Sequence, residues 1–222
     1  MANAVTKVNS IAIANIAKIN GQNDSDLAKL NTLEFTGVAP DAHVLIATDT
    51  SDGSDATLGF TSGIDSTYDV YEFVFTNIHP ESDAKFAFQF DTGELENYNQ
   101  PITSTFLLAW HREDDGSAGM GYESGNDQGQ GTAYQPLAGE IVESSDADSS
   151  ISGILTLYGP SSSTYVKHFM GVSNYFQQDP AQQNVYVAGY VNTETPLTRI
   201  SFKFESGEIQ GGEIKMYGIA KS

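Results

Sequence analysis

The chain has 222 residues, of which 39% are hydrophobic and 11% aromatic, so it can bury a sizeable core as one large domain or two small ones, and wholesale disorder is excluded. Cysteine is absent, which excludes disulfides, thiolate metal sites and catalytic thiols. The formal net charge is −19, and because a field of that sign repels phosphate, we expect no nucleic acid among the partners.

An internal repeat occupies the first 39 residues. The tripeptide Lys-apolar-Asn occurs at residues 7–9, 18–20 and 29–31, eleven residues apart each time. A short repeat of this kind cannot bury its apolar positions alone and needs stacked neighbours or a partner surface. We therefore expect residues 1–39 to form an anchoring or oligomerisation arm of three 11-residue repeats.

The arm is expected to bury its apolar side chains only against other subunits, gaining roughly 25 cal/mol per Å² removed from water. The side chains expected to make that contact are Val8, Ile11, Ile13, Ile16, Ile19, Leu27, Leu30 and Leu33. Two local structures fit the arm. A period of eleven residues, about 3.67 per turn, is typical of a helical coil. The Asn20-Gly21 turn dipeptide and the alternation of isoleucine with alanine at residues 11–14 favour short strands joined by tight turns, which is the interpretation we prefer.

Neither a membrane span nor a secretory signal is expected in this chain. No apolar run approaches the roughly 18 residues that are needed to cross a bilayer. The apolar stretch at residues 11–17 is short, is interrupted by Asn15 and is followed by Lys18, which does not match a signal peptide. We therefore expect no membrane among the partners.

Beyond Pro40 the periodicity of apolar residues is two, which is the pattern of half-buried strands. Phe73 and Phe75 share one face of their segment, and Phe86, Phe88 and Phe90 share one face of the next. The segments expected to be strands are 43–48, 56–60, 68–75, 84–91, 104–110, 152–159, 164–172, 184–191, 199–206 and 213–219, with a weak one near 137–142.

Clusters of Gly, Asp, Ser and Asn separate these segments, and no long amphipathic helix lies between them. That arrangement predicts an all-β fold built as an antiparallel β-sandwich rather than a parallel sheet. We expect residues 40–222 to form this domain, as a jelly roll or, alternatively, as a concanavalin-like sandwich. Strand spacing alone does not distinguish the two.

The opening ANAVTKVNSIAIANIAKINGQNDSDLAKLN, residues 2–31, resembles the leaders of virion structural proteins of tailed bacteriophages, particularly marine and cyanobacterial ones. Residues 62–80, 163–173 and 211–222 resemble the β-sandwich part of the same proteins. The resemblance implies a non-enzymatic particle component, present in multiple copies and often trimeric, such as a head decoration protein, a head fibre or a tail-attached protein. It implies other capsid or tail subunits as partners, location in the virion, no catalytic residues and no cofactor.

Aromatic residues in segments rich in Gly, Asn and Gln are the strongest candidates for contacts with a ligand. They are Tyr122, Tyr134, Tyr175 and Phe176. Sugar sites use aromatic faces together with amide and carboxylate hydrogen bonds, so the alternative function is a carbohydrate-binding, receptor-recognition module of a phage fibre, with a host surface glycan as partner. The competing interpretation is that these rings plug the ends of the sandwich or form a subunit interface.

Metal binding and catalysis have weaker support in the sequence. Asp49, Asp52 and Asp55 place three carboxylates around a glycine and form a weak Ca²⁺ candidate, although their spacing departs from an EF-hand loop and also fits a solvated turn. The HREDD segment at residues 111–115 gathers acids beside Trp110, but neighbouring residues of a strand end point in alternate directions. We therefore expect no catalytic residue.

Overall fold

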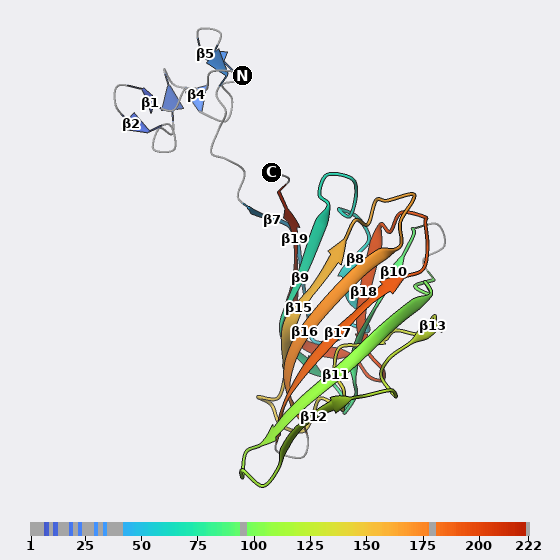
Figure 1. The fold of residues 1–222 in the computed structure, drawn as a ribbon. Coiled ribbons are helices and arrows are strands. Elements are labelled where there is room, and N and C mark those ends of the chain that lie inside the picture. Colours follow the sequence, from blue (N-terminus) through green and yellow to red (C-terminus); the bar gives the residue numbers. More distant parts are fainter. Residues whose placement is uncertain are drawn as a thin grey trace. The chain divides into compact units, whose positions relative to one another are not determined.

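The computed structural model describes residues 42–93, 97–177 and 181–220, together with the backbone of six short strands between residues 7 and 34 (Figure 1). The chain divides into two units, residues 1–44 and 45–222, and each is described by itself. The described residues contain strands and turns but no helix. Accordingly, that part of the chain offers no helix with the length and apolar character to span a membrane.

Three small hairpins lie in the N-terminal unit. β1 (Lys7–Val8) pairs with β2 (Ile11–Ala12), β3 (Lys18–Ile19) with β4 (Gln22–Asn23), and β5 (Lys29–Leu30) with β6 (Leu33–Glu34). All three pairs are antiparallel, and two residues lie between the innermost paired positions of each. Every Lys-apolar-Asn tripeptide therefore begins one hairpin, which follows the strand interpretation of the repeat and not the helical one. The side chains proposed for the arm contact lie outside the described residues.

A nine-stranded sheet forms the larger layer of the second unit. Its strands are β7 (His43–Thr50), β9 (Val70–Pro80), β11 (Ile102–Arg112), β12 (Ala118–Tyr122), β13 (Gly129–Gly131), β15 (Ile151–Tyr158), β16 (Lys167–Gln177), β17 (Ala181–Val191) and β19 (Ile209–Ile219). They are ordered β12-β11-β17-β16-β15-β9-β19-β7, and β13 pairs with β11 (Figure 1).

A four-stranded sheet forms the smaller layer. Its strands are β8 (Leu58–Phe60), β10 (Phe86–Asp91), β14 (Gln135–Pro136) and β18 (Arg199–Phe204), in the order β14-β10-β18-β8. Three antiparallel pairings are nested along the chain: β9 with β19, β10 with β18 and β11 with β17. The first and third pairs lie in the large sheet and the second lies in the small one, so the chain changes sheets between successive strands.

Phenylalanine rings join the two layers. Phe88 of β10 meets Phe169 of β16 edge to face at 5.3 Å between ring centroids, and Phe86 contacts Phe75 of β9 at 5.6 Å. All four rings are buried. Aromatic pairs of this kind stabilise a core beyond the area they bury. The predicted all-β, antiparallel fold is confirmed, and its two sheets share one core.

The inward face predicted for 84–91 is confirmed, but the opposite face of β10 is buried as well. Gln89 is fully buried there, and its Nε2 donates to the carbonyl oxygens of Ala133 at 2.9 Å and of Gln100 and Thr132 at 3.2 Å. The weak strand predicted near 137–142 is wrong, because within that segment only Val142 pairs, through two isolated bridges to Ala84 and Gln177. The short strands β12, β13 and β14 were not expected, since β12 and β13 are rich in glycine and β14 has only two residues, Gln135 and Pro136.

Candidate functional site

A row of apolar side chains crosses the outer face of the large sheet. Ile154 of β15 lies opposite Val172 of β16, Val172 lies opposite Tyr186 of β17, and the register continues to Leu107 of β11 and Tyr122 of β12. Each of these five side chains, here called the outer apolar row, is between 42% and 54% exposed. Side chains alternate between the two faces of a strand, and this alternation places the row on the outer face. On β15, β16 and β17 the residues before and after each member of the row are more buried than the member itself.

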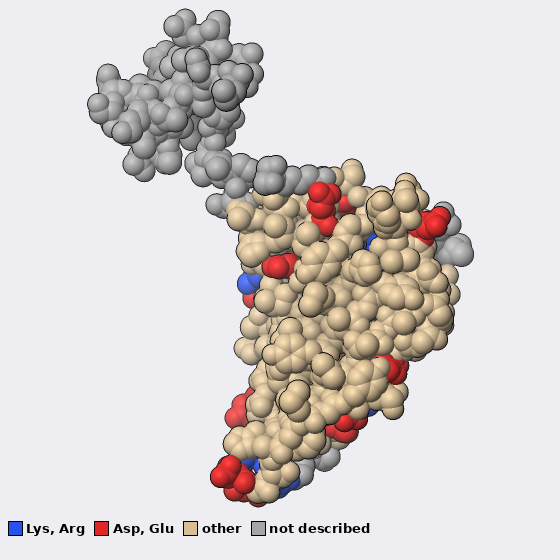
Figure 2. All heavy atoms as spheres, viewed as in Figure 1, with Lys and Arg blue, Asp and Glu red and all other residues tan. Residues whose placement is uncertain are grey.

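Formal charge is absent from the middle of this face. Along 151–158, 167–177 and 181–191 the only Asp, Glu, Lys or Arg residue is Lys167, whose side chain points inward and is fully buried. In a chain of net charge −19 this is an unusual surface. Figure 2 shows acidic side chains toward the margins of the face in view, and Figure 1 places β15, β16 and β17 across the middle in the same view. A contiguous exposed apolar surface of this kind is typical of a protein interaction site.

The same face is hollowed over β9, β15 and β16. The hollow has a volume of about 480 Å³. Its lining includes Ile154, Tyr158, Met170, Val172 and Asn174, with Glu72 of β9 at its border. Because most of these side chains are apolar or uncharged, the hollow suits a packed protein side chain better than a charged ligand.

A second concavity, here called the Trp110 cleft, lies on the inner side of the large sheet. Its volume is about 420 Å³. The residues that line it are Leu108, Trp110, Arg112, Ser117, Glu123, Glu140, Gln177, Ala181 and Gln183. Unlike the outer hollow, it combines an indole ring with amides, two carboxylates and a guanidinium.

Tyr175 was predicted to contact a ligand, but it lies beneath this cleft and its ring is buried. The side chain is 2% exposed, and its hydroxyl donates to Gln183 Oε1 and accepts from the backbone N–H of Glu140 at 2.6 Å. Burial raises the pKa of the Tyr175 phenol well above its ordinary value, so the hydroxyl stays protonated. It positions groups of the cleft but offers no ring face to a ligand.

The other predicted ligand residues do not gather at one place. Tyr122 belongs to the outer apolar row, and its hydroxyl donates to Asp127. Phe176 is half-buried near the end of β16. Tyr134 is also half-buried, with Lys203 Nζ 4.5 Å from its ring centroid, and it lines a separate hollow of about 290 Å³. The structure therefore does not support a single site made from the four aromatic residues.

The loop that was the Ca²⁺ candidate uses its carboxylates to hold its own backbone. Asp49 Oδ2 accepts from the N–H of Gly59 at 2.7 Å, Asp52 Oδ1 from that of Ser54 at 3.0 Å, and Asp55 Oδ2 from that of Asp52 at 2.8 Å. Within the described ranges, no three His, Cys, Asp or Glu side chains are arranged to hold a metal ion. The loop therefore gives the calcium candidate no support, because each carboxylate serves a turn or a neighbouring strand.

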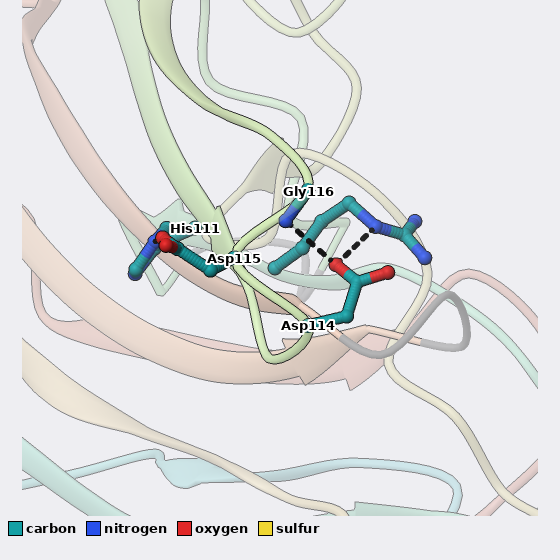
Figure 3. A network of polar contacts seen from close by, with 5 residues as sticks. His111, Asp114, Asp115 and Gly116 are labelled. Carbon is teal, nitrogen blue, oxygen red and sulfur yellow. Dashed lines mark hydrogen bonds and ion pairs between the residues drawn. The ribbon is translucent and has the colours of Figure 1, made fainter.

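The HREDD segment forms the turn of the β11–β12 hairpin, and its polar groups divide between two sides (Figure 3). Asp114 Oδ1 accepts from the N–H of Gly116 at 2.9 Å and from Arg112 Nε at 3.2 Å, while His111 Nε2 lies 3.0 Å from Asp115 Oδ1. The Gly116 N–H, and then Arg112, lower the pKa of the Asp114 carboxyl. The turn therefore holds Arg112 at the rim of the Trp110 cleft.

The Trp110 cleft was not predicted from the sequence. One signal was present: the alternating run Phe106, Leu108, Trp110, Arg112 changes from apolar to amphipathic along one strand face. Glu140, by contrast, comes from a distant segment and could be placed only by the fold. Comparison of the chain with protein-family models, with curated proteins and with solved structures gives no match.

Proposed function

We propose that this protein is a non-enzymatic structural component of a tailed bacteriophage virion, anchored by residues 1–39 and displaying the β-sandwich. The resemblance of residues 2–31 to virion-protein leaders supports the proposal. The observation that carries it is the agreement between repeat and structure: each 11-residue unit contains one hairpin, at 7–12, 18–23 and 29–34.

Hairpins this small need a partner. Each strand has two residues, and an isolated two-stranded hairpin is at best marginally stable in water. Three such units hold too little apolar surface to offset the entropy of ordering them. Packing against neighbouring subunits removes that surface from water, so attachment and ordering of the arm occur together.

For the sandwich domain we propose a jelly roll. The nested pairs β9–β19, β10–β18 and β11–β17, alternating between the two sheets, support this choice over a concanavalin-like sandwich.

We propose that copies of the chain contact one another through the outer apolar row. Two bodies of the same negative charge repel least where neither presents an ionised group, and the centre of this face presents none. The exposed rings and aliphatic side chains supply apolar area for burial. A homo-oligomer is the proposed form on the particle, and the choice of a trimer rests on the resemblance alone.

Recovery on particles tests the proposed attachment. The full chain carrying Val8→Asp, Ile19→Asp and Leu30→Asp places one charge in each hairpin and is expected to stay folded but to be lost from purified particles. The matched chain with Val8→Ile, Ile19→Val and Leu30→Ile keeps the apolar surface and is expected at normal copy number. Normal recovery of the aspartate variant would refute attachment through the arm.

A further inference from the structure

The inner face of the large sheet changes character along β11. Phe106 and Leu108 are buried in the core, and Trp110 and Arg112 follow on the same face of the strand. Gln183 of β17 lies directly opposite Trp110 and also points inward. The inward face of the sheet is therefore apolar in the core and continues into the Trp110 cleft, where the residues are aromatic and polar.

A buried amide at the base of the cleft is held in one orientation. Gln183 is only 4% exposed, its Oε1 accepts from the Tyr175 hydroxyl, and its Nε2 donates to Gln177 Oε1. The Tyr175 hydroxyl also fixes the backbone of Glu140 through its N–H at 2.6 Å. Polar groups that the fold has already oriented lose little conformational entropy when a ligand binds.

Both the indole and the guanidinium of the cleft are held from behind. Trp110 lies opposite Gly119. Because glycine has no side chain, the indole packs directly on the Gly119 backbone. Arg112 is 29% exposed, and its Nε donates to Asp114 Oδ1 at 3.2 Å. The aromatic surface and the cationic group at the rim are therefore preorganised.

This combination of groups matches the chemistry of a sugar ring. A pyranose has apolar C–H faces that pack on an indole, and hydroxyls that both donate and accept hydrogen bonds. The cleft offers acceptors on Glu123 and Glu140, donors on Arg112, and both kinds on Ser117 and Gln177. Its volume of about 420 Å³ falls within the range of about 300–1,000 Å³ typical of small-molecule sites. We propose that the Trp110 cleft binds a neutral saccharide unit of a larger glycan.

Charge selects the neutral class of sugar. Two carboxylates and one guanidinium line the cleft, so its formal charge is negative when all three are ionised. The whole chain adds a field of the same sign. Uronic acids, sialic acids and sugar phosphates are therefore disfavoured. This inference does not depend on the proposed attachment to a particle, since it concerns a site within residues 108–183.

The single tryptophan of the chain makes a direct test possible, because all indole fluorescence reports on Trp110. We would titrate the full chain with neutral oligosaccharides of glucose, galactose, mannose and N-acetylglucosamine, and with oligogalacturonate as the acidic counterpart. The expected result is a saturable change with at least one neutral oligosaccharide and none with oligogalacturonate. Absence of a saturable change with every neutral sugar into the millimolar range, or preference for the acidic one, would overturn the proposal.

Substitutions locate the binding. Glu140→Ala and Arg112→Ala change side chains at the exposed part of the cleft and are expected to weaken saccharide binding at least about tenfold. Tyr165→Ala removes a ring that is 74% exposed, lies just before β16 and does not line the cleft, and it is expected to leave the affinity within about twofold. Unfolding curves of each variant establish that it is folded. Binding that survives both cleft substitutions, or that is lost with Tyr165→Ala, would contradict the assignment to the cleft.

Discussion

Trp110 lies directly across the β11–β12 pair from Gly119, and its indole packs so closely that a Cβ on residue 119 would lie 2.6 Å from the Cζ2 atom. A glycine is needed here for space. The relationship explains how a large ring can sit at the edge of a cleft and still be held in one position.

Gly119→Ala is therefore expected to displace the indole, change its fluorescence and lower the free energy of unfolding by about 1–3 kcal/mol. Gly121→Ala, two residues further along the same strand, is the control, because the nearest atom to its added Cβ is Glu123 Oε1 at 3.8 Å. That variant should stay within about 0.5 kcal/mol of the native chain. Urea unfolding followed by tryptophan fluorescence checks both, and equal behaviour of the two alanines would contradict the packing described.

Tyr175→Phe deletes a buried hydroxyl and leaves the Glu140 N–H and Gln183 Oε1 without their partner. The expected loss in the free energy of unfolding is about 1–3 kcal/mol, the cost of an unsatisfied buried polar group. Tyr186→Phe makes the same chemical change on a ring that is 54% exposed and is expected to be nearly neutral. Equal stability of the two variants in urea unfolding would argue against a structural role for the Tyr175 hydroxyl.

Alternation of apolar residues was enough to predict the layers of the fold. It placed Phe73 and Phe75 on one face and Phe88 in the core, because a period of two leaves little choice of inward face once one side is buried. The buried position of Tyr175 was not predicted, because the expected strand ended at residue 172. Its neighbours Asn174 and Gln177 resemble a loop, yet the pairing of β16 with β17 continues to Gln177 and carries the alternation with it.

The Trp110 cleft depends on contacts that no local pattern contains. Glu140 reaches the cleft because the Tyr175 hydroxyl binds its N–H across 35 positions of sequence. The Asp-rich loop shows that residues close in sequence need not form a site together. The carboxylates of Asp49, Asp52 and Asp55 each accept from a backbone N–H.

Val172→Lys, in the middle of the outer apolar row, is expected to dissociate the proposed homo-oligomer or weaken it at least about tenfold, because a charge would be buried in an apolar contact. Thr195→Lys adds the same charge at an exposed position between β17 and β18 and serves as control. Sedimentation velocity at several concentrations measures the change. A native chain that is monomeric throughout, or a Val172→Lys variant that assembles as the native chain does, would refute the proposed contact through the outer apolar row.

Lys167 gives the stability of the domain a specific dependence on pH. Its side chain is fully buried, with Nζ donating to the Thr193 carbonyl oxygen at 2.9 Å, and burial lowers the pKa of the ammonium group. In the unfolded chain that pKa is about 10.4, so between the folded and unfolded values the unfolded state binds more protons, and stability rises with pH. The penalty of the buried charge is complete below the folded pKa and absent above about 10.4.

Relative to Lys167→Met, the native chain should therefore gain stability as the pH rises toward 10.4, while titration of the tyrosines cancels in the difference. Urea unfolding of both proteins across the alkaline range measures this difference. A difference in the free energy of unfolding that does not change with pH would show that Lys167 has an ordinary pKa in the fold.

We propose that residues 1–39 attach the protein to a virion by packing their hairpins against other subunits. An image reconstruction of the intact particle would test this attachment. We expect ordered density for hairpins 7–12, 18–23 and 29–34, packed on neighbouring subunits at every copy of the sandwich. Sandwich density joined to the particle through another surface, with these hairpins touching nothing, would contradict the claim.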